Sequence, residues 1–337
     1  MRRTRILAVI IVAVMGLVMC AIIFLNGRAS TDYAPVSFEE QRIQYASKDN
    51  RFPEIEQLAK EIQTGSASES VPNPEIGDDA VLNQSQAPDA EFVSLIRSAL
   101  DSELIIPPVF DFASDAEGAL AWHRDMEVIA KNLKDEGDRF LDAGDVQGAI
   151  DTYFCLLDLA EAVSQGGVLM TSNLFTSTSF QGLYPTHQLL PTLDIEQLAY
   201  VQQELEQHIN EIPPFESFVA NEREMIRESD TQNFMQRFVT ERFIFAPARE
   251  SMRDGYERSL SIFLGTDLRA RVLLYQAEHG SEPENLQLLF PDGGTVPIDP
   301  ATGNQFQIVN GKIFSTGERT MGRSVNPDSM TDGSRVF

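Results

Sequence analysis

Residues 114–167 read SDAEGALAWHRDMEVIAKNLKDEGDRFLDAGDVQGAIDTYFCLLDLAEAVSQGG, and this segment carries the clearest helical pattern in the chain. It begins with Ser114-Asp-Ala-Glu117, which matches the capping box that starts many helices, and apolar residues then recur at helical spacing. Asp142–Asp145 form a turn, a second apolar series follows over Val146–Val163, and Gly166-Gly167 ends it. Because two helices with so short a connection fold back on each other, the segment predicts an antiparallel helical hairpin.

The same periodicity predicts further helices on both sides of the hairpin. Before it, we expect a short helix that begins at Phe52 and ends at Gly65. After it, a largely buried helix from Leu169 is expected to end near Gly182 or Pro185. Other helices are expected over residues 92–100, 194–212, 215–226, 234–245 and 256–279, with Pro247 as an interruption and Gly280 as the final cap.

Near the C-terminus the pattern changes from helical to alternating. Residues 306–315 read FQIVNGKIFS, in which two short β-prone runs flank Asn310-Gly311, the strongest short-range signal for a hairpin turn. Ile308 should lie opposite Ile313. The resulting apolar face is expected to pack against the last helix.

Ile6–Leu25 is an apolar segment without a charged residue, ILAVIIVAVMGLVMCAIIFL. As one helix it is long enough to cross a hydrocarbon core of about 30 Å. Met1–Arg5 carries three arginines and no acid, and positively charged flanks stay in the cytoplasm. We therefore predict an uncleaved, single-pass signal anchor in the inner (cytoplasmic) membrane of a bacterium, with the N-terminus in the cytoplasm.

Three other signals fit this N-terminus less well. A cleaved signal peptide would have a shorter apolar core and small residues before its cleavage point, where Ala29-Ser30 offers only a weak site. A lipoprotein signal would use Cys20, but Met19 before it is large and the residues after it are hydrophobic. A prepilin leader would need a glycine, then an aromatic residue and a nearby glutamate, which Gly16-Leu17 does not supply.

Composition and periodicity divide the chain into six segments. These are a cytoplasmic N-terminus (1–5), the anchor (6–25), a stalk and flexible acidic linker (26–91), a helical body (92–255), a long helix with the β-hairpin (256–320) and a flexible tail (321–337). The linker prediction depends on Thr64–Glu91, which contains no aromatic residue and is rich in Ser, Pro, Asp and Glu. The predicted fold is mainly α: a transmembrane helix, an extracytoplasmic multi-helix body and a small C-terminal antiparallel β-hairpin.

The charge balance limits the possible partners. The chain has 51 acidic and 26 basic residues and a formal net charge of −25. Such a field repels phosphate groups, so we expect no nucleic-acid binding and no second contact with anionic lipid. Only two cysteines are present, Cys20 in the anchor and Cys155 on an apolar helix, so a disulfide framework is excluded.

The helical hairpin resembles one tetratricopeptide unit. The small residue, first aromatic, turn, alanine and second aromatic of that family fall at Gly137, Phe140, Gly144, Ala149 and Tyr153. The family's tryptophan, leucine and closing proline are replaced by Leu133, Glu136 and Glu161. No second copy lies one repeat away, and simple packing of two amphipathic helices explains the same spacing, so both interpretations stay open.

A second resemblance involves a long helix, a glycine turn, a leucine pair, a Pro-x-Asp-Pro loop and a small sheet. These features lie at Leu274-Tyr275, His279-Gly280, Leu286, Leu289, Pro297–Pro300, Gly303-Asn304 and Phe314–Gly317. Their order resembles the C-terminal half of type II secretion major pseudopilins. The resemblance implies this fold but not filament assembly, because no prepilin leader is present. A calcium loop would follow here, where Glu318, Asp328 and Asp332 are candidate ligands, and whether they bind a cation stays open.

No catalytic or metal-binding pattern stands out. His123, His187, His208 and His279 show no zinc-ligand spacing. Glu204 and His208 share a helix face, but such pairs are more often surface electrostatics than ligand sets. No serine lies in a G-x-S-x-G elbow, and no glycine-rich phosphate loop is present. We therefore predict no catalytic residues, no metal ligands and no cofactor.

Together these features predict an envelope-associated interaction or scaffolding protein without catalytic activity, which binds an unidentified protein partner. The layout also resembles that of uncharacterised bacterial membrane-anchored helical proteins. One alternative is an accessory component of a secretion or pilus-like machine. A second is a hydrolase, which would need His187 or His208 gathered with carboxylates in a pocket. Neither the partner nor the oligomeric state follows from the sequence.

Overall fold

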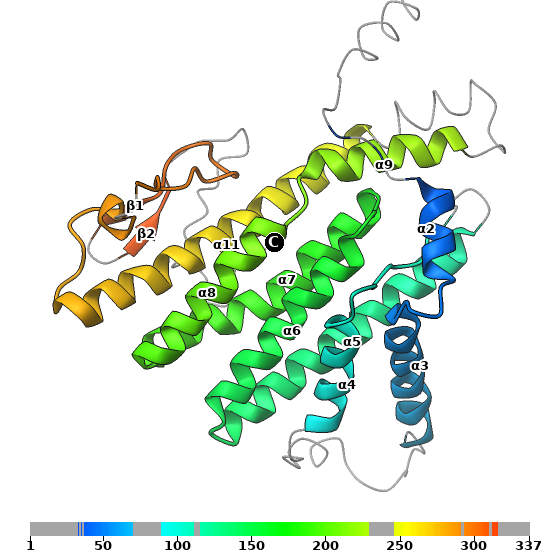
Figure 1. The fold of residues 1–337 in the computed structure, drawn as a ribbon, viewed down its shortest axis with the longest axis horizontal. Coiled ribbons are helices and arrows are strands. Elements are labelled where there is room, and N and C mark those ends of the chain that lie inside the picture. The colour runs from blue at the N-terminus through cyan, green and yellow to red at the C-terminus, as the bar shows by residue number, and fades with distance from the viewer. Residues whose placement is uncertain are drawn as a thin grey trace, which may run out of the picture.

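The computed structural model describes residues 33, 35, 37–69, 89–110, 115–228, 246–290, 293–309 and 312–315. Over these residues the chain is mainly helical and carries one small antiparallel sheet, as predicted (Figure 1). Within the same ranges, no helix combines the length and apolarity needed to cross a bilayer. The predicted anchor Ile6–Leu25 lies outside the described residues.

The elements, in chain order, are α2 (Phe38–Tyr45), α3 (Phe52–Glu69), α4 (Ala90–Leu100), α5 (Ala116–Asp142), α6 (Val146–Ser164), α7 (Leu169–Leu189), the 3-10 helix η1 (Leu190–Thr192), α8 (Ile195–Glu211), α9 (Phe215–Glu228), α11 (Ala246–His279), the 3-10 helix η3 (Leu286–Leu289), β1 (Gln307–Val309) and β2 (Lys312–Phe314). α5, α6 and α7 pack in sequence, α11 lies against α7 and α8, and α3 lies against α5. Figure 1 shows these helices as an array with α2 at one end and the β-hairpin at the other.

The predicted helical hairpin is confirmed as α5 and α6, which pack along each other. Asp115, rather than the expected Ser114, caps α5, because the Asp115 carboxylate accepts the Gly118 N–H at 3.0 Å. A Cβ added at Gly137 would come within 2.4 Å of the Tyr153 ring, so two positions of the tetratricopeptide resemblance do meet in the hairpin interface. Any closely packed hairpin uses such a contact, and the family assignment stays a resemblance.

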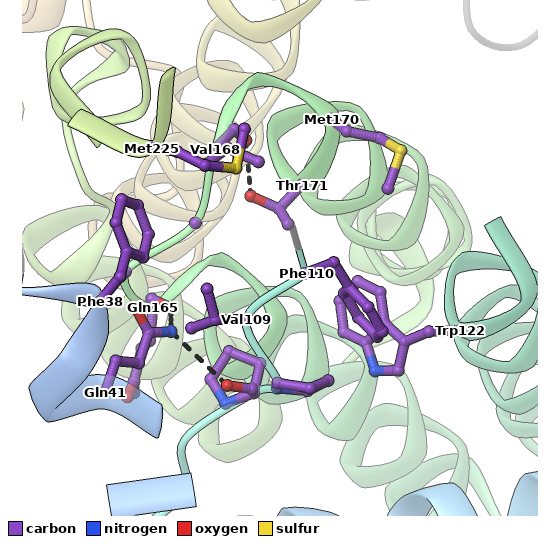
Figure 2. A pocket seen from close by; sticks show the side chains of 14 residues that line it. Phe38, Gln41, Val109, Phe110, Trp122, Gln165, Val168, Met170, Thr171 and Met225 are labelled. Carbon is purple, nitrogen blue, oxygen red and sulfur yellow. Dashed lines mark hydrogen bonds between the residues drawn. The ribbon is translucent and has the colours of Figure 1, made fainter. Parts of the chain in front are cut away.

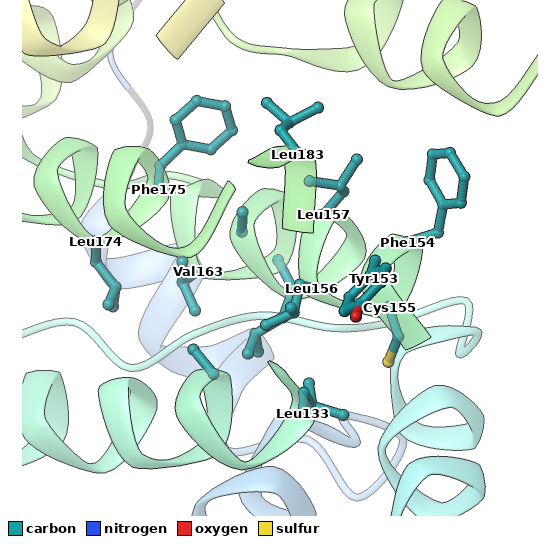
Figure 3. Packing of buried hydrophobic residues seen from close by; sticks show 14 of the residues in the cluster. Leu133, Tyr153, Phe154, Cys155, Leu156, Leu157, Val163, Leu174, Phe175 and Leu183 are labelled. Atoms are coloured by element: carbon teal, nitrogen blue, oxygen red, sulfur yellow. The ribbon is translucent and has the colours of Figure 1, made fainter. Parts of the chain in front are cut away.

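α6 is the centre of the main core. Nearly every residue from Ala149 to Ser164 is buried, as expected for a helix that has partners on all sides. Figure 3 shows Tyr153, Leu156 and Leu157 between the neighbouring helices. The cluster extends from α3 to α9 and includes residues of α11 from Tyr256 to Ala270. α11 therefore packs in the main core as well as against the hairpin. The predicted boundary at residue 256, between the helical body and the long helix, does not separate two cores.

The prediction that α7 ends near Gly182 or Pro185 is wrong, because the helix continues to Leu189. Gly182 lies where α7 approaches α6 most closely, with a hypothetical Cβ only 2.5 Å from the Tyr153 carbonyl oxygen. It is therefore a contact residue and not a terminator. Pro185 removes one backbone donor, but packing against α6 and α11 holds the helix across it.

The last long helix begins earlier than predicted, at Ala246 instead of Tyr256. Pro247 does not interrupt it. As the second residue of α11, Pro247 lies in the first turn, where a backbone N–H has no intrahelical acceptor and proline is tolerated. The predicted end is confirmed, since Gly280 has φ +73° and its N–H bonds to the Gln276 carbonyl at 2.9 Å. The predicted helix over Phe234–Phe245 lies outside the described residues.

The C-terminal hairpin is also confirmed, with Ile308 paired to Ile313 across β1 and β2. Its turn, Asn310-Gly311, lies outside the described residues. Phe306 and Ile313 are buried against Leu268 and Val272 of α11, in a second and smaller core cluster. The hairpin therefore rests on the C-terminal half of the long helix.

Part of the predicted stalk, residues 26–91, belongs to the body instead. Phe52, Ile55 and Ala59 of α3 are completely buried in the main cluster. α3 also extends past Gly65 to Glu69, so the predicted end at Gly65 is wrong. The apolar stripe of α3 is too short to be recognised as a core element from the sequence, and only the contact with α5 decides its place. Residues 70–88, most of the predicted linker, lie outside the described residues, as does the predicted tail 321–337.

Candidate functional site

The four histidines have different surroundings. His123 lies 3.6 Å from Glu127 on the same helix, and His279 stacks on Tyr275 at the end of α11. His187 is buried, with its Nδ1 3.3 Å from the Thr266 hydroxyl. His208 lies with two carboxylates from another helix.

His208 of α8 is held between two carboxylates of α6. Its Nδ1 is 2.6 Å from Glu161 Oε1, and its Nε2 is 3.7 Å from Asp158 Oδ1. The imidazole ring also stacks on Phe154, with 5.7 Å between ring centroids. The His208 side chain is only 5% exposed. Because both ring nitrogens face carboxylates, the arrangement fixes the ring and joins α8 to α6.

Each of these groups holds its proton to a higher pH than usual. Burial alone lowers the pKa of His208, but the hydrogen bond and charge of Glu161, with the charges of Asp158 and Glu204, raise it overall. Burial raises the pKa of Asp158 to about 6, although the nearby His208 opposes this. Burial likewise raises the pKa of Glu161. The folded protein therefore binds more protons here than the unfolded chain at mildly acidic pH.

We expect the His208→Gln variant to lose more stability near pH 6 than near pH 9. A histidine whose pKa is raised by folding stabilises fully below its unfolded pKa of about 6.5, and this contribution disappears as pH rises through the folded value. Urea unfolding of wild type and variant at several pH values should show a difference of about 1–3 kcal/mol at the acidic end. His279→Gln, at an exposed position, serves as the control. A difference that is constant or that grows with pH would contradict the expectation.

Five parts of the chain surround a pocket (Figure 2). They are α2, residues 107–110, α5, the α6–α7 connection with the start of α7, and α9. Its walls are mostly apolar and include Phe38, Val109, Phe110, Trp122, Met170 and Met225. Phe110 and Trp122 contact each other at a centroid distance of 5.7 Å. The cavity volume is about 20 Å³, enough for about one water molecule or the tip of a side chain.

Gln41 is one of the polar residues that line this pocket. Its Nε2 donates to the carbonyl oxygens of Pro107 at 3.5 Å and Gln165 at 3.4 Å, so the side chain joins α2 to two separate segments. The Oε1 atom is buried and has no hydrogen-bond partner within the described part of the chain. An acceptor without a donor in a buried position is costly, and a bound donor would remove that cost.

The sequence did not reveal this pocket. Pro107-Pro108 and Gly166-Gly167 were recognised separately as helix ends, but nothing in either pattern shows that the two breaks meet. Phe38 and Gln41 lie in a segment predicted to be a stalk. The one feature in the sequence that could have indicated a buried position here is the apolar Phe38 in a mainly polar stretch, and such a residue does not specifically indicate a pocket.

The Pro297–Pro300 loop surrounds a buried aspartate. The Asp299 carboxylate accepts hydrogen bonds from the hydroxyls of Ser261, Ser315 and Thr302, the last at 2.8 Å, and from the Ala301 N–H at 3.0 Å. Ser261 belongs to α11, and Ser315 follows β2. The aspartate therefore fastens the hairpin to the long helix.

No metal centre can be assigned to the described residues. Among them, no three His, Cys, Asp or Glu side chains are placed to hold a metal ion. The candidate calcium ligands Glu318, Asp328 and Asp332 lie outside these residues. Cys155 is fully buried, and burial raises the pKa of its thiol well above the usual range, so it is a packing residue.

Comparisons of the chain with protein families, with curated proteins and with solved structures found no match.

Proposed function

We propose that this chain is a membrane-anchored, extracytoplasmic interaction protein without catalytic activity, whose helical body binds another protein. The observation that carries the proposal is the pocket around Phe38, Trp122 and Met170. It combines an apolar wall, flexible methionines and one buried acceptor without a partner, features typical of a binding site.

The size of the pocket favours a protein over a metabolite as the ligand. Sites for small molecules usually enclose about 300–1,000 Å³. The present cavity, at about 20 Å³, accepts only the end of a side chain. Because the chain has a formal net charge of −25, it would attract a partner with a basic surface electrostatically.

The membrane location rests on Ile6–Leu25 and the arginines before it. The proposed location is the bacterial inner membrane, with the N-terminus in the cytoplasm and the body on the extracytoplasmic side. We expect the full chain to stay with the membrane after alkaline carbonate washing, and a variant that lacks residues 1–32 to be recovered in the soluble fraction. Release of the full chain by carbonate would contradict the anchor.

A matched crosslinking pair tests the pocket. A photoreactive amino acid at Met170, which lines the pocket, should crosslink to a discrete partner in cells, and Phe38→Ala should abolish that crosslink. The same amino acid at exposed Leu288, on η3, is the control. Crosslinks that are equal at both positions, or that are unaffected by Phe38→Ala, would argue against a specific interaction at the pocket.

The runner-up is an accessory role in a secretion or pilus-like machine. It is supported by the β-hairpin on the C-terminal half of α11 and by the Asp299 loop, the features on which the pseudopilin resemblance depends. Purification together with an inner-membrane secretion complex would favour it. A hydrolase has less support. His208 does lie with two carboxylates, but both of its ring nitrogens are directed at them, and none of the three residues lines the Phe38 pocket.

A further inference from the structure

The first helix of the described body, α2, begins at Phe38. Phe38 is 1% exposed and packs with Val168 and Met225, and Gln41 bonds to two distant segments. The next connection is fixed as well, since the Asn50 side chain donates to the Tyr45 and Ile106 carbonyls at 3.1 and 3.0 Å. α2 and its connection to α3 are therefore part of the body and not part of a tether.

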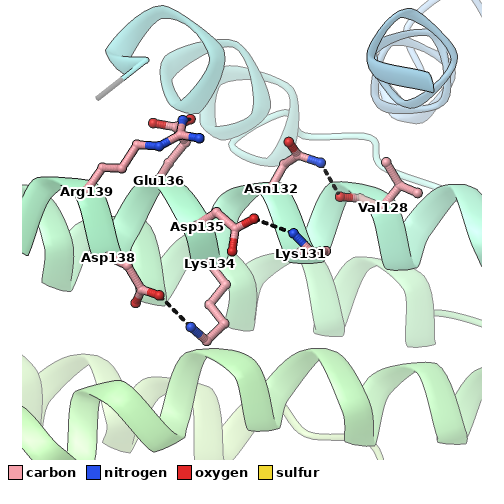
Figure 4. Close-up of polar contacts among 8 residues, drawn as sticks. All are labelled: Val128, Lys131, Asn132, Lys134, Asp135, Glu136, Asp138 and Arg139. Atoms are coloured by element: carbon pink, nitrogen blue, oxygen red, sulfur yellow. Dashed lines mark hydrogen bonds and ion pairs between the residues drawn. The ribbon is translucent and has the colours of Figure 1, made fainter. Parts of the chain in front are cut away.

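The acidic segment between α3 and α4 does not separate the body from the membrane either. α3 and α4 contact each other, and both contribute to the main core. The start of α4 is fixed to α5, because the Asp89 N–H donates to Glu136 Oε2 at 2.7 Å and Glu136 also pairs with Arg139 (Figure 4). The helices on both sides of residues 70–88 therefore belong to the body.

At most residues 26–37 remain between the anchor and the body. Twelve residues span at most about 43 Å when fully extended, at roughly 3.6 Å per residue. A flexible chain of this length has an end-to-end distance of about 20 Å. A tether that extended to residue 91 would instead reach more than about 200 Å.

The attachment point lies at one end of the body. Figure 1 shows the start of α2 beside α9, with the β-hairpin at the opposite end of α11. The 34 residues of α11 correspond to a length of about 51 Å. The length of α11 alone therefore exceeds the full reach of the tether.

We infer that the end of the body formed by α2, α9 and the α6–α7 connection is held at the membrane surface, and that the β-hairpin end points away from it. This inference rests on the proposed anchor. It also places the Phe38 pocket at the membrane, within reach of the extramembrane part of other membrane proteins.

Energy transfer to acceptor-labelled lipids in vesicles tests the inference. Donors are attached at Glu39→Cys on α2 and, separately, at Leu288→Cys on η3, in the full chain with Cys20→Ala; buried Cys155 is not expected to react with the label. A third sample carries the Glu39→Cys donor and a Gly-Ser insertion of about 24 residues after Gly27, which raises the mean tether span to about 35 Å. We expect transfer from position 39 to exceed that from position 288 several-fold, and the insertion to reduce it.

Two results would overturn the inference for vesicle-bound protein. Equal transfer from positions 39 and 288 would show that the body has no preferred end at the membrane. Transfer from position 39 that is unchanged by the insertion would show that the short tether does not control the distance. Failure of the full chain to float with the vesicles would instead contradict the anchor itself.

Discussion

Replacement of Gly182 by alanine is expected to lower the free energy of unfolding by about 2–4 kcal/mol. The added Cβ would lie 2.5 Å from the Tyr153 carbonyl oxygen and 3.0 Å from Leu157 Cδ2. Because the closest atom belongs to the backbone of α6, no rotation of a side chain can relieve the clash. α6 and α7 must move apart at the centre of the main core. Equilibrium unfolding in urea, followed by circular dichroism, measures the loss.

Gly255 offers a matched control within another helix. It lies inside α11, where an added Cβ would have no heavy atom within 4 Å. Alanine there should raise stability by roughly 0.5–1 kcal/mol, because glycine loses more conformational entropy in a helix. The two substitutions are chemically identical and should have opposite signs. A neutral or stabilising Gly182→Ala would show that α6 and α7 are not as closely packed as described.

Replacement of Asp299 by alanine should release the C-terminal hairpin from α11. The substitution leaves the hydroxyls of Ser261, Thr302 and Ser315 without their shared acceptor, at a cost of about 2–4 kcal/mol. The hairpin has its own small core cluster, so it can open while the main core stays folded. Hydrogen exchange should therefore accelerate at the cross-strand pairs Gln307–Phe314 and Val309–Lys312, whose amides the hairpin ladder protects, and stay unchanged in α6.

Asp135→Ala is the control for this experiment. Asp135 forms an exposed ion pair with Lys131 at 2.5 Å on α5 (Figure 4), and such pairs contribute about 0–1 kcal/mol. Its removal should leave the exchange of the hairpin amides as in wild type. If Asp299→Ala also left them protected, the aspartate would not be what holds the hairpin in place.

Both predictions involve residues whose roles the sequence alone assigned differently. Gly182 and Pro185 are residue types that often end a helix. Packing on both sides of α7 outweighs their low helix propensity. Asp299 was identified only as part of the Pro297–Pro300 loop of the pseudopilin resemblance. Its bonds to Ser261 and Ser315 join positions 38 and 16 residues apart, and no local pattern encodes such a link.

The candidate sites show the same limit. The sequence analysis paired His208 with Glu204 on its own helix. Its direct partners, Asp158 and Glu161, come from α6, and in the sequence the whole of α7 lies between α6 and α8. The Phe38 pocket unites segments that the sequence divided between a stalk and a body. Sites of this kind are made by long-range packing, whereas periodicity reports only contacts within one helix or one hairpin.

The sequence by itself determined the helical class, the α5–α6 hairpin, the cap at Gly280, and the β-hairpin with Ile308 opposite Ile313. Each of these depends on interactions between residues that are close in the chain. Only the tertiary structure decided that α2 and α3 belong to the body and that α7 continues through its glycine and proline. The physical reason is that burial against a distant helix contributes more free energy than local propensity, and the partner in that burial cannot be read from the segment itself.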